Sequence, residues 1–318
     1  MRERLRDIRL GRPSLDKAIK KRYRAPVEAL LKHDLPVDVQ VYHRHYAVLY
    51  EALVYDSSSD LAIVRLILDH GTDPDGIVYN VLDNEESALF VAVRKESLSS
   101  VELLLDAGAD PESHCQVLKM SPLQLALTRN QRDTAKLLLE RGADPNTVSG
   151  RGSVGTAIQM ASAADDTEMV RLLLSHHARP DLLAGIMPHT ALQMAARNGC
   201  KDIVDMLIEH GANVNAPAAE SYGATALQFT AIHGYLGITY FLLRNGADVN
   251  APCGTFGRRT ALEGAAEHGR IDMVQMLLDA GANIRGDGRW QYERALAYAS
   301  GNGHHYWNRI MVSRFTNT

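Results

Sequence analysis

The stretch Thr190-Ala-Leu-Gln-Met-Ala-Ala-Arg-Asn-Gly-Cys-Lys-Asp-Ile-Val-Asp-Met-Leu-Ile-Glu-His-Gly-Ala-Asn-Val-Asn215 decides the fold of this chain. It opens with Thr190 and, three residues later, Gln193, a capping box in which two side chains satisfy free backbone amides at a helix start. A second helix is expected to end at Gly211, because glycine adopts the left-handed conformation at low cost. The stretch therefore predicts a helix, a turn, a second helix and a connecting loop.

Both landmarks of this stretch recur along the chain in a fixed phase. Residues equivalent to Gly211 follow one another at steps of 34 to 37 residues, with His177 in one slot, and a helix start precedes the glycine by 21 residues in the regular copies. Such a period indicates an internal repeat. The glycines are Gly71, Gly108, Gly142, Gly211, Gly246 and Gly281, and the helix starts are Ser87, Ser121, Thr156, Thr190, Thr225 and Thr260.

The side chains within each copy fit a pair of packed helices. Pro122 stands at a first helical position, where a missing N–H costs nothing, and small residues such as Ala195 and Ala265 let neighbouring first helices approach closely. Weaker copies near Leu15, Leu49 and Ala295 bring the number of units to nine, with degenerate ends typical of caps. Capping boxes are predicted at Ser121–Gln124, Thr156–Gln159, Thr190–Gln193, Thr225–Gln228 and Thr260–Glu263.

This unit of about 33 residues resembles the ankyrin repeat. The longer loops, such as residues 250–259, are similar to those in the ankyrin arrays of filamentous fungi. The resemblance implies an all-α ankyrin-repeat solenoid with β-hairpin fingers between the helix pairs. We expect a basic N-terminal arm at residues 1–12, ankyrin repeats over 13–284 and a C-terminal capping repeat over 285–318.

The composition is ordinary for a soluble folded protein, with 318 residues, 46% of them hydrophobic, 23% charged and a net charge of -4. No apolar run approaches the roughly 18 residues of a membrane span, and the N-terminus lacks the pattern of a secretory signal. Cys115, Cys200 and Cys253 lie too far apart for a disulfide framework or a cysteine zinc site. We expect an intracellular protein, cytoplasmic or nuclear, that makes no membrane contact.

Positive charge is concentrated at the N-terminus, where residues 1–24 hold ten Lys or Arg and three Asp or Glu. This segment is interpreted as a solvated helix face, although docking on an acidic partner, nuclear targeting and phosphate contact stay open. The rest of the chain is acidic, and Tyr23 is the one aromatic residue among the basic residues of segment 1–24. Nucleic acid is therefore disfavoured as a partner.

The sequence contains two apparent motifs of cofactor or metal binding, but neither stands in the context that such a site requires. Residues 150–155 spell G-x-G-x-x-G, but the repeat register places them on a finger and not after a buried strand. His43 and His45 lack a matched third ligand. We expect no cofactor, no metal and no catalytic residue.

The resemblance implies that another protein binds the concave face. This face consists of the finger tips and the exposed sides of the first helices. Tyr222, Phe256 and Trp290 recur every 34 residues near successive finger tips. Such a ladder, with arginine between the rings, would form an interface hot spot. Alternatively each ring packs its own finger, which is the favoured interpretation for Trp290 alone. The predicted binding residues are His189, Arg197, Asn198, Tyr222, Ile232, His233, Phe256, Arg259, Glu267, His268 and Trp290.

The main interpretation is thus a non-catalytic interaction or scaffolding module. The alternative is a small-molecule binder or an acid–base enzyme of the isomerase or cyclase type. His233, Glu267 and His268 occupy equivalent groove positions on neighbouring repeats, where a general acid and a general base could meet. A closed pocket around them would favour this alternative.

Overall fold

A computed structural model shows a protein built mainly of helices, as the predicted all-α fold class requires. The structure describes residues 15, 17–32, 40–41, 44–45, 48–55, 61–75, 78–79, 85–113, 120–148, 155–184, 189–219, 223–254, 259–285 and 288–304. The chain divides into two compact units, Met1–Ala157 and Ile158–Thr318. Each unit is described by itself.

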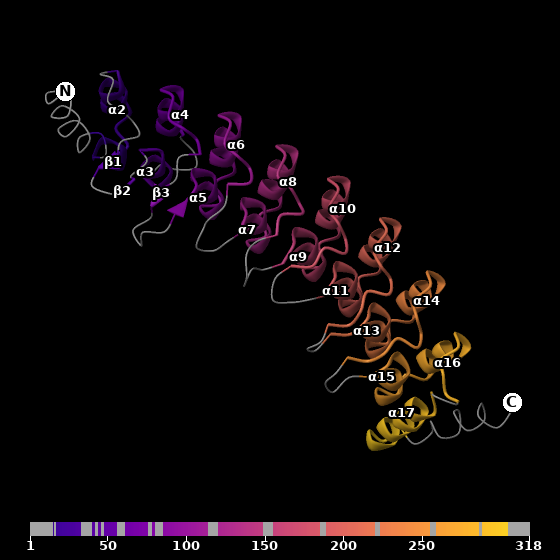
Figure 1. Ribbon diagram of the computed structural model, residues 1–318. Helices are drawn as coiled ribbons and strands as arrows, with labels where there is room; N and C mark the ends of the chain where they lie inside the picture. Colours follow the sequence, from indigo (N-terminus) through magenta and orange to yellow (C-terminus); the bar gives the residue numbers. More distant parts are fainter. Residues whose placement is uncertain are drawn as a thin grey trace. The chain divides into compact units, whose positions relative to one another are not determined.

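The first unit is a stack of short helix pairs, each pair forming one repeat (Figure 1). The first helices α3, α5 and α7 pack on one another in succession, and the second helices α2, α4, α6 and α8 form the other layer. A short helical segment at residues 17–20 precedes α2 in the first repeat. The bounds are α2 (Arg24–Leu31), α3 (Val48–Tyr55), α4 (Ala62–Asp69), α5 (Ala88–Arg94), α6 (Leu98–Asp106), α7 (Pro122–Thr128) and α8 (Arg132–Glu140).

Two antiparallel strand pairs lie in the loops of this unit. β1 (Gln40–Val41) pairs with β2 (Arg44–His45), and β3 (Val78–Tyr79) pairs with β4 (Glu85–Glu86). These two loops have the predicted β-hairpin form. The tips of the later fingers lie outside the described residues.

The second unit continues the same pattern. The first helices α11, α13, α15 and α17 pack in succession, and α10, α12, α14 and α16 line up as the second helices (Figure 1). The bounds are α9 (Ala157–Ala163), α10 (Thr167–Ser175), α11 (Ala191–Asn198), α12 (Lys201–Glu209), α13 (Ala226–His233), α14 (Leu236–Arg244), α15 (Ala261–Glu267), α16 (Ile271–Asp279) and α17 (Arg289–Gly301).

The capping glutamines have a second role that joins helix to loop. Four of the five predicted capping boxes are present, at Ser121, Thr190, Thr225 and Thr260. The amide of Gln193 also donates to the carbonyls of Ala216 and Pro217, at 3.1 and 2.9 Å. One buried side chain therefore caps its own helix and fixes the loop that follows, with its polar atoms satisfied.

The turn after α10 shows that the repeat dictates the backbone even where glycine is missing. His177 adopts a φ of 65°, close to the 83° of Gly211 one repeat later. A non-glycine residue takes this conformation at some cost in free energy. His177 thus takes the left-handed conformation that glycine takes in the other copies.

Helix α17 is longer than the others, with 13 residues against 7 to 9. The repeat register puts the start of this copy at Ala295, but the helix already begins at Arg289. Arg294 stands in the slot of the capping threonine, 34 residues after Thr260, and an arginine side chain cannot accept a hydrogen bond from an amide. The helix therefore extends toward its N-terminus, and Arg294 becomes an interior helical residue.

Part of the basic N-terminal charge is used inside the first unit. The Nζ of Lys20 lies 3.6 Å from a carboxylate oxygen of Glu51 and 5.5 Å from the ring centroid of Tyr55. The Nε of Arg22 donates to the carbonyl of Tyr55 at 2.6 Å. These contacts agree with a helix face as the role of this part, while the predicted arm at 1–12 lies outside the described residues. Across the described residues, every helix is too short or too polar to cross a membrane.

Candidate functional site

The described members of the predicted binding set lie on the first helices of the second unit or at residues next to the ends of these helices. We call the side chains of α11, α13, α15 and α17 that do not face the second helices, together with the residues directly before these helices, the first-helix surface. Tyr222 and Phe256 lie outside the described residues. Of the expected aromatic ladder, the described structure thus places only Trp290.

An upstream cluster forms around Phe229 of α13. The Arg197 guanidinium lies 6.0 Å from the centroid of the Phe229 ring, and the ring of His189 meets it edge-on at 5.7 Å. His189 is only 8% exposed, whereas Arg197 is exposed. Arg197 can therefore contact a partner, while His189 supports the ring beneath it.

Asn198 has a structural contact of its own. Its Nδ2 donates to the carbonyl of Ala163 at 3.0 Å, which ties the end of α11 to the end of α9. One of the two Nδ2 protons of Asn198 is therefore used within the chain and is not available to a partner.

The two groove histidines share one arrangement. Nδ1 of His233 lies 2.8 Å from the carbonyl of Phe229, and Nδ1 of His268 lies 3.0 Å from that of Gly264. Because a carbonyl can only accept, Nδ1 carries the proton in both rings and Nε2 is the unprotonated nitrogen of the neutral imidazole. The His233 ring also stacks on Tyr235 at 5.6 Å, with the planes 10° apart.

A downstream cluster brings together two of the predicted residues, Arg259 and Glu267. Nε and Nη2 of Arg259 donate to the two carboxylate oxygens of Glu267 at 2.8 and 3.0 Å. The guanidinium also lies 3.8 Å from the ring centroid of Tyr298 in α17. A planar guanidinium bonded in this bidentate way and stacked on a ring is held in one orientation.

Arg294 extends this cluster to the exposed Trp290. Its guanidinium lies 5.5 Å from the Trp290 ring and 5.7 Å from the Tyr298 ring, and its Nη2 donates to the Tyr298 hydroxyl at 3.3 Å. Trp290 remains 48% exposed. Arg259, Trp290, Arg294 and Tyr298 thus alternate cation and ring, and we call them the arginine–aromatic cluster.

Glu263 anchors this cluster from beneath. Its side chain is completely buried, and Nε of Arg294 lies 3.1 Å from its Oε1. Burial raises the pKa of the Glu263 carboxyl, against the opposing effects of the Thr260 amide and the Arg294 charge. Elsewhere a glutamine amide at this slot donates to the next loop; a carboxylate cannot, and an arginine faces it instead.

Sequence reasoning missed Arg294, Tyr298 and Phe229. One signal for Arg294 was available, because Glu263 breaks the run of glutamines at the third position of the capping boxes. A buried acid at that slot calls for a cation from the next repeat. Phe229 and Tyr298 occupy the same position in their repeats, four residues after Thr225 and Arg294 respectively. The sequence of one repeat does not show that an aromatic ring at this position meets an arginine.

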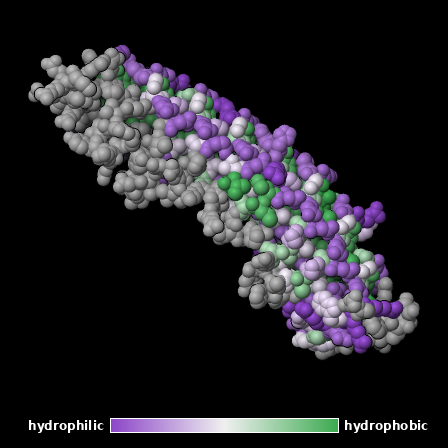
Figure 2. Space-filling model, viewed as in Figure 1, coloured by the Kyte–Doolittle hydropathy of each residue, from purple (hydrophilic) through white to green (hydrophobic). Residues whose placement is uncertain are grey.

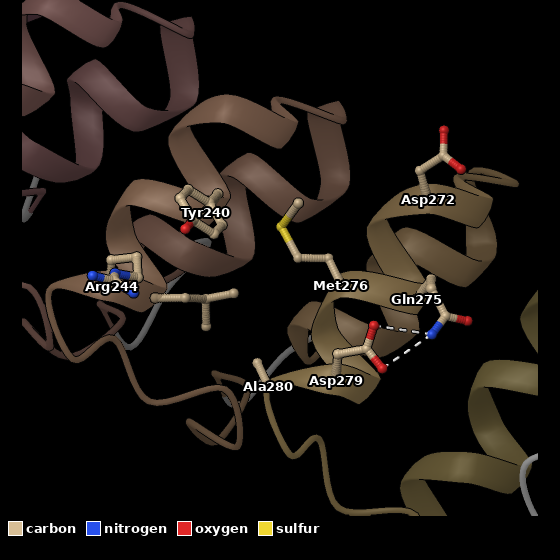
Figure 3. A pocket seen from close by; sticks show the side chains of 8 residues that line it. Tyr240, Arg244, Asp272, Gln275, Met276, Asp279 and Ala280 are labelled. Atoms are coloured by element: carbon tan, nitrogen blue, oxygen red, sulfur yellow. Dashed lines mark hydrogen bonds between the residues drawn. The ribbon is translucent and has the colours of Figure 1, made fainter.

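A groove of about 530 Å³ lies away from this surface, between the second helices α14 and α16. Figure 3 shows Tyr240 and Arg244 on α14 facing Met276 on α16 across it. None of His233, Glu267 and His268 lines this groove. Among the described residues, no group of three or more His, Cys, Asp or Glu side chains is arranged to hold a metal ion.

Comparisons with known proteins agree with the helix-pair architecture. A family model described as ankyrin repeats (3 copies) matches residues 45–149, 152–218 and 218–287. The human ankyrin repeat and MYND domain-containing protein 1 is 28% identical over 179 residues, which span 52% of this chain and 19% of that protein. The chain thus matches about a fifth of the length of this relative.

The solved ankyrin repeat domain of Bcl-3, a member of the IkappaB protein family, is similar in fold. The TM-score is 0.54 at 23% identity, and the match covers 68% of this chain and 92% of that domain. The family-model matches extend over most of the chain and coincide with the observed helix pairs. This chain belongs to the ankyrin-repeat family.

Proposed function

We propose that this chain is a protein-interaction module whose first-helix surface binds another protein, with the arginine–aromatic cluster at the centre of the contact. Ankyrin repeats are in general protein–protein interaction modules. The observation that carries the proposal is the alternation of Arg259, Tyr298, Arg294 and Trp290, in which the guanidinium groups lie 3.8 to 5.7 Å from the centroids of the neighbouring rings. Tryptophan, tyrosine and arginine are the residues that most often dominate interface energetics.

The cluster is held in position before any partner arrives. Glu267 fixes Arg259 through two hydrogen bonds, and the buried Glu263 fixes Arg294. Side chains that are already ordered lose little conformational entropy on binding, so more of the contact free energy appears as affinity. This supports a binding role for the cluster and not merely one in packing.

The partner is expected to present acidic and apolar groups together. Arg197 is exposed at one end of the first-helix surface, and the Arg294 side chain is 41% exposed at the other. Trp290 offers a large apolar ring beside Arg294. A carboxylate next to an aromatic or aliphatic side chain fits both features.

Affinity capture with the full chain tests the proposal. Wild type, Trp290→Ala, Arg197→Ala and Tyr240→Ala are immobilised at equal density, and the retained proteins are identified by mass spectrometry. We expect a protein retained by wild type and by Tyr240→Ala but depleted by the other two variants. Tyr240 is a matched control because its ring is exposed to a similar degree, 57% against 48% for Trp290, but lies on a second helix. Retention that is unchanged in Trp290→Ala and Arg197→Ala would overturn the proposal.

The proposed surface includes Tyr222 and Phe256. If they belong to the contact, Tyr222→Ala and Phe256→Ala each weaken capture by roughly 2 kcal/mol and leave the melting temperature unchanged. A lower melting temperature would instead assign the rings to packing of their own fingers.

The acid–base alternative gains no support from the described geometry. The Glu267 carboxylate is occupied by Arg259, and the groove between α14 and α16 lies on the second-helix side of the repeats. In a metabolite screen we expect no substrate that wild type consumes and His268→Ala does not. One such substrate would reinstate catalysis, since loss of a general acid or base typically costs 10² to 10⁴ in rate.

An intracellular location, cytoplasmic or nuclear, remains part of the proposal. It is supported by the free thiols of Cys200 and Cys253, because unpaired cysteines suit a reducing compartment.

A further inference from the structure

The end of helix α3 in the first unit gathers positive charge from the repeats on both sides. Arg22, from the repeat before, donates through Nε to the carbonyl of Tyr55 at 2.6 Å, and Lys95, from the repeat after, donates through Nζ to the carbonyl of Val54. Nζ of Lys20 lies 5.5 Å from the centroid of the Tyr55 ring. Three cations are therefore held around the last turn of one helix.

The bonds to carbonyls position these cations without neutralising them. The last carbonyls of a helix carry partial negative charge and attract cations, but a carbonyl is a neutral acceptor and the cation keeps its charge. Among the described residues, Lys20 faces the carboxylate of Glu51 at 3.6 Å, whereas Arg22 faces a carbonyl and no carboxylate. The exposed carboxylate of Glu96 is balanced by Arg129 of the next repeat, at 3.4 Å.

The other carboxylates of this region lie beneath the cations. The side chain of Glu51 is 14% exposed against 46% for Lys20, and that of Glu86 is 7% exposed against 36% for Arg94, its partner at 2.9 Å. Burial raises the pKa of the Tyr50 hydroxyl in α3, and the charges of Arg94, Glu86 and Glu51 act on it too, which places both ion pairs around one side chain. A partner that approaches here meets cations before it meets carboxylates.

Two exposed tyrosine rings lie beside the cations. Tyr23 is 54% exposed, with Nζ of Lys21 at 6.0 Å from its centroid, and Tyr55 is 39% exposed next to Lys20. Such rings add contact area to a charged surface. We call Lys20, Lys21, Arg22, Tyr23, Tyr55 and Lys95 the α3-end surface.

We propose that the α3-end surface docks an acidic segment of another protein, in which two carboxylates stand close together. Arg22 and Lys95 are held at the carbonyls of successive residues, so their like charges are neighbours, and anions placed between them would relieve the repulsion. Charge-assisted hydrogen bonds from both groups would then fix the segment. The α3-end surface shares no residue with the first-helix surface of the second unit.

The charge of the whole chain favours a short acidic segment as the occupant. The net charge is -4, although residues 1–24 hold ten Lys or Arg and three Asp or Glu, so the rest of the chain is acidic. An acidic body repels a long polyanion such as nucleic acid, whereas a short segment contacts the local cations alone.

Peptide display on the immobilised full chain tests this surface. A library of random twelve-residue peptides is depleted on the double variant Arg22→Gln, Lys95→Gln and then selected on wild type. We expect enriched peptides with neighbouring Asp or Glu residues. Synthetic copies should bind each single variant roughly threefold to fivefold more weakly than wild type, and the double variant about tenfold or more. Both side chains are exposed, so unchanged melting temperatures will show that the variants are folded.

Arg65→Gln is the matched control. It removes the same charge from an exposed residue of α4 in the same unit, on the second-helix side. Figure 2 shows hydrophilic residues over most of the side that the second helices form. The affinity of the peptides should be unchanged on Arg65→Gln, and a loss equal to that on Arg22→Gln would mean diffuse attraction and overturn the site.

Other outcomes would also overturn the proposal. One is a selection that enriches no acidic peptides. A second is a loss of affinity on Trp290→Ala without a loss on the Arg22 and Lys95 variants, which would assign the peptides to the first-helix surface. A labelled twelve-nucleotide oligothymidylate supplies the last arm: if it binds as tightly as the peptides and is lost on the same variants, nucleic acid is the occupant and the acidic segment is rejected.

Discussion

Nε of Arg294 in α17 lies 3.1 Å from Oε1 of Glu263 in α15, and the Glu263 side chain has no exposed surface. This ion pair joins the last described repeat to the one before it. It stands where a glutamine amide and loop carbonyls meet in the earlier repeats. Charge has thus replaced a neutral contact at the C-terminal end of the stack.

Removing the cation alone should destabilise the protein. Arg294→Ala leaves a buried carboxylate without its partner, and we expect a loss of about 2 kcal/mol, below the range for fully buried pairs because Arg294 is 41% exposed. Glu263→Gln in the same background should recover most of this, since an amide carries no charge. Urea unfolding of the four proteins of this double-mutant cycle measures the coupling; additive effects would contradict the ion pair.

The stability that Glu263 contributes should fall as pH rises. Burial raises the carboxyl pKa in the folded state, so between its ordinary value of 4.5 and the raised value the folded protein binds more protons than the unfolded one. The free energy of unfolding of wild type should therefore decrease relative to Glu263→Gln as pH rises through this window, and the difference should be constant above it. Unfolding curves of both proteins from pH 4 to 8 check the sign, and a difference that moves in favour of wild type would refute it.

Two helical glycines are expected to respond oppositely to alanine. At Gly237 in α14 an added Cβ meets nothing within 4 Å, so Gly237→Ala should stabilise the helix by about 0.5 to 1 kcal/mol. At Gly264 in α15 it would lie 2.5 Å from Cγ1 of Ile232, so Gly264→Ala should cost about 1 to 3 kcal/mol. Thermal melting separates the two cases. A stabilised Gly264→Ala would show that Ile232 moves aside freely.

The expected reactivity of the thiols follows from their surroundings. Burial raises the pKa of Cys200 to about 12, with a further contribution from a hydrogen bond to Asp165. At pH 8 its thiolate fraction should be roughly a thousandfold below that of an ordinary cysteine. In a Cys115→Ser background, iodoacetamide should therefore label Cys253 first and Cys200 only after denaturation. Equal labelling rates in the folded protein would contradict this.

The repeat itself was predictable from the sequence because each of its landmarks has a local cause. Thr190 and Gln193 cap a helix through two hydrogen bonds within four residues, and Gly211 takes a positive φ, so both signals can be read without knowing the fold. The predicted fold class, four of five capping boxes and the fingers at β1–β2 and β3–β4 are confirmed. Contacts between side chains of different repeats could not be predicted in the same way.

The start of α17 depends on what Arg294 cannot do as a cap, and its contact with Glu263 crosses a whole repeat. His189 was expected at the surface because of its place in the repeat, but the adjacent helix supplies Phe229 to cover it. The groove at Tyr240 is lined by residues of two successive repeats, so it depends on how α14 and α16 pack and not on any single residue.

The most direct measurement of the central claim is a calorimetric titration of a captured partner against four versions of the full chain: wild type, Trp290→Ala, Arg294→Ala combined with Glu263→Gln, and Tyr240→Ala. If the first-helix surface is the binding site, Trp290→Ala and the double variant should each lose roughly 2 kcal/mol of binding free energy or more. Tyr240→Ala should bind like wild type. A partner that binds Trp290→Ala and the double variant with the affinity of wild type would contradict the account.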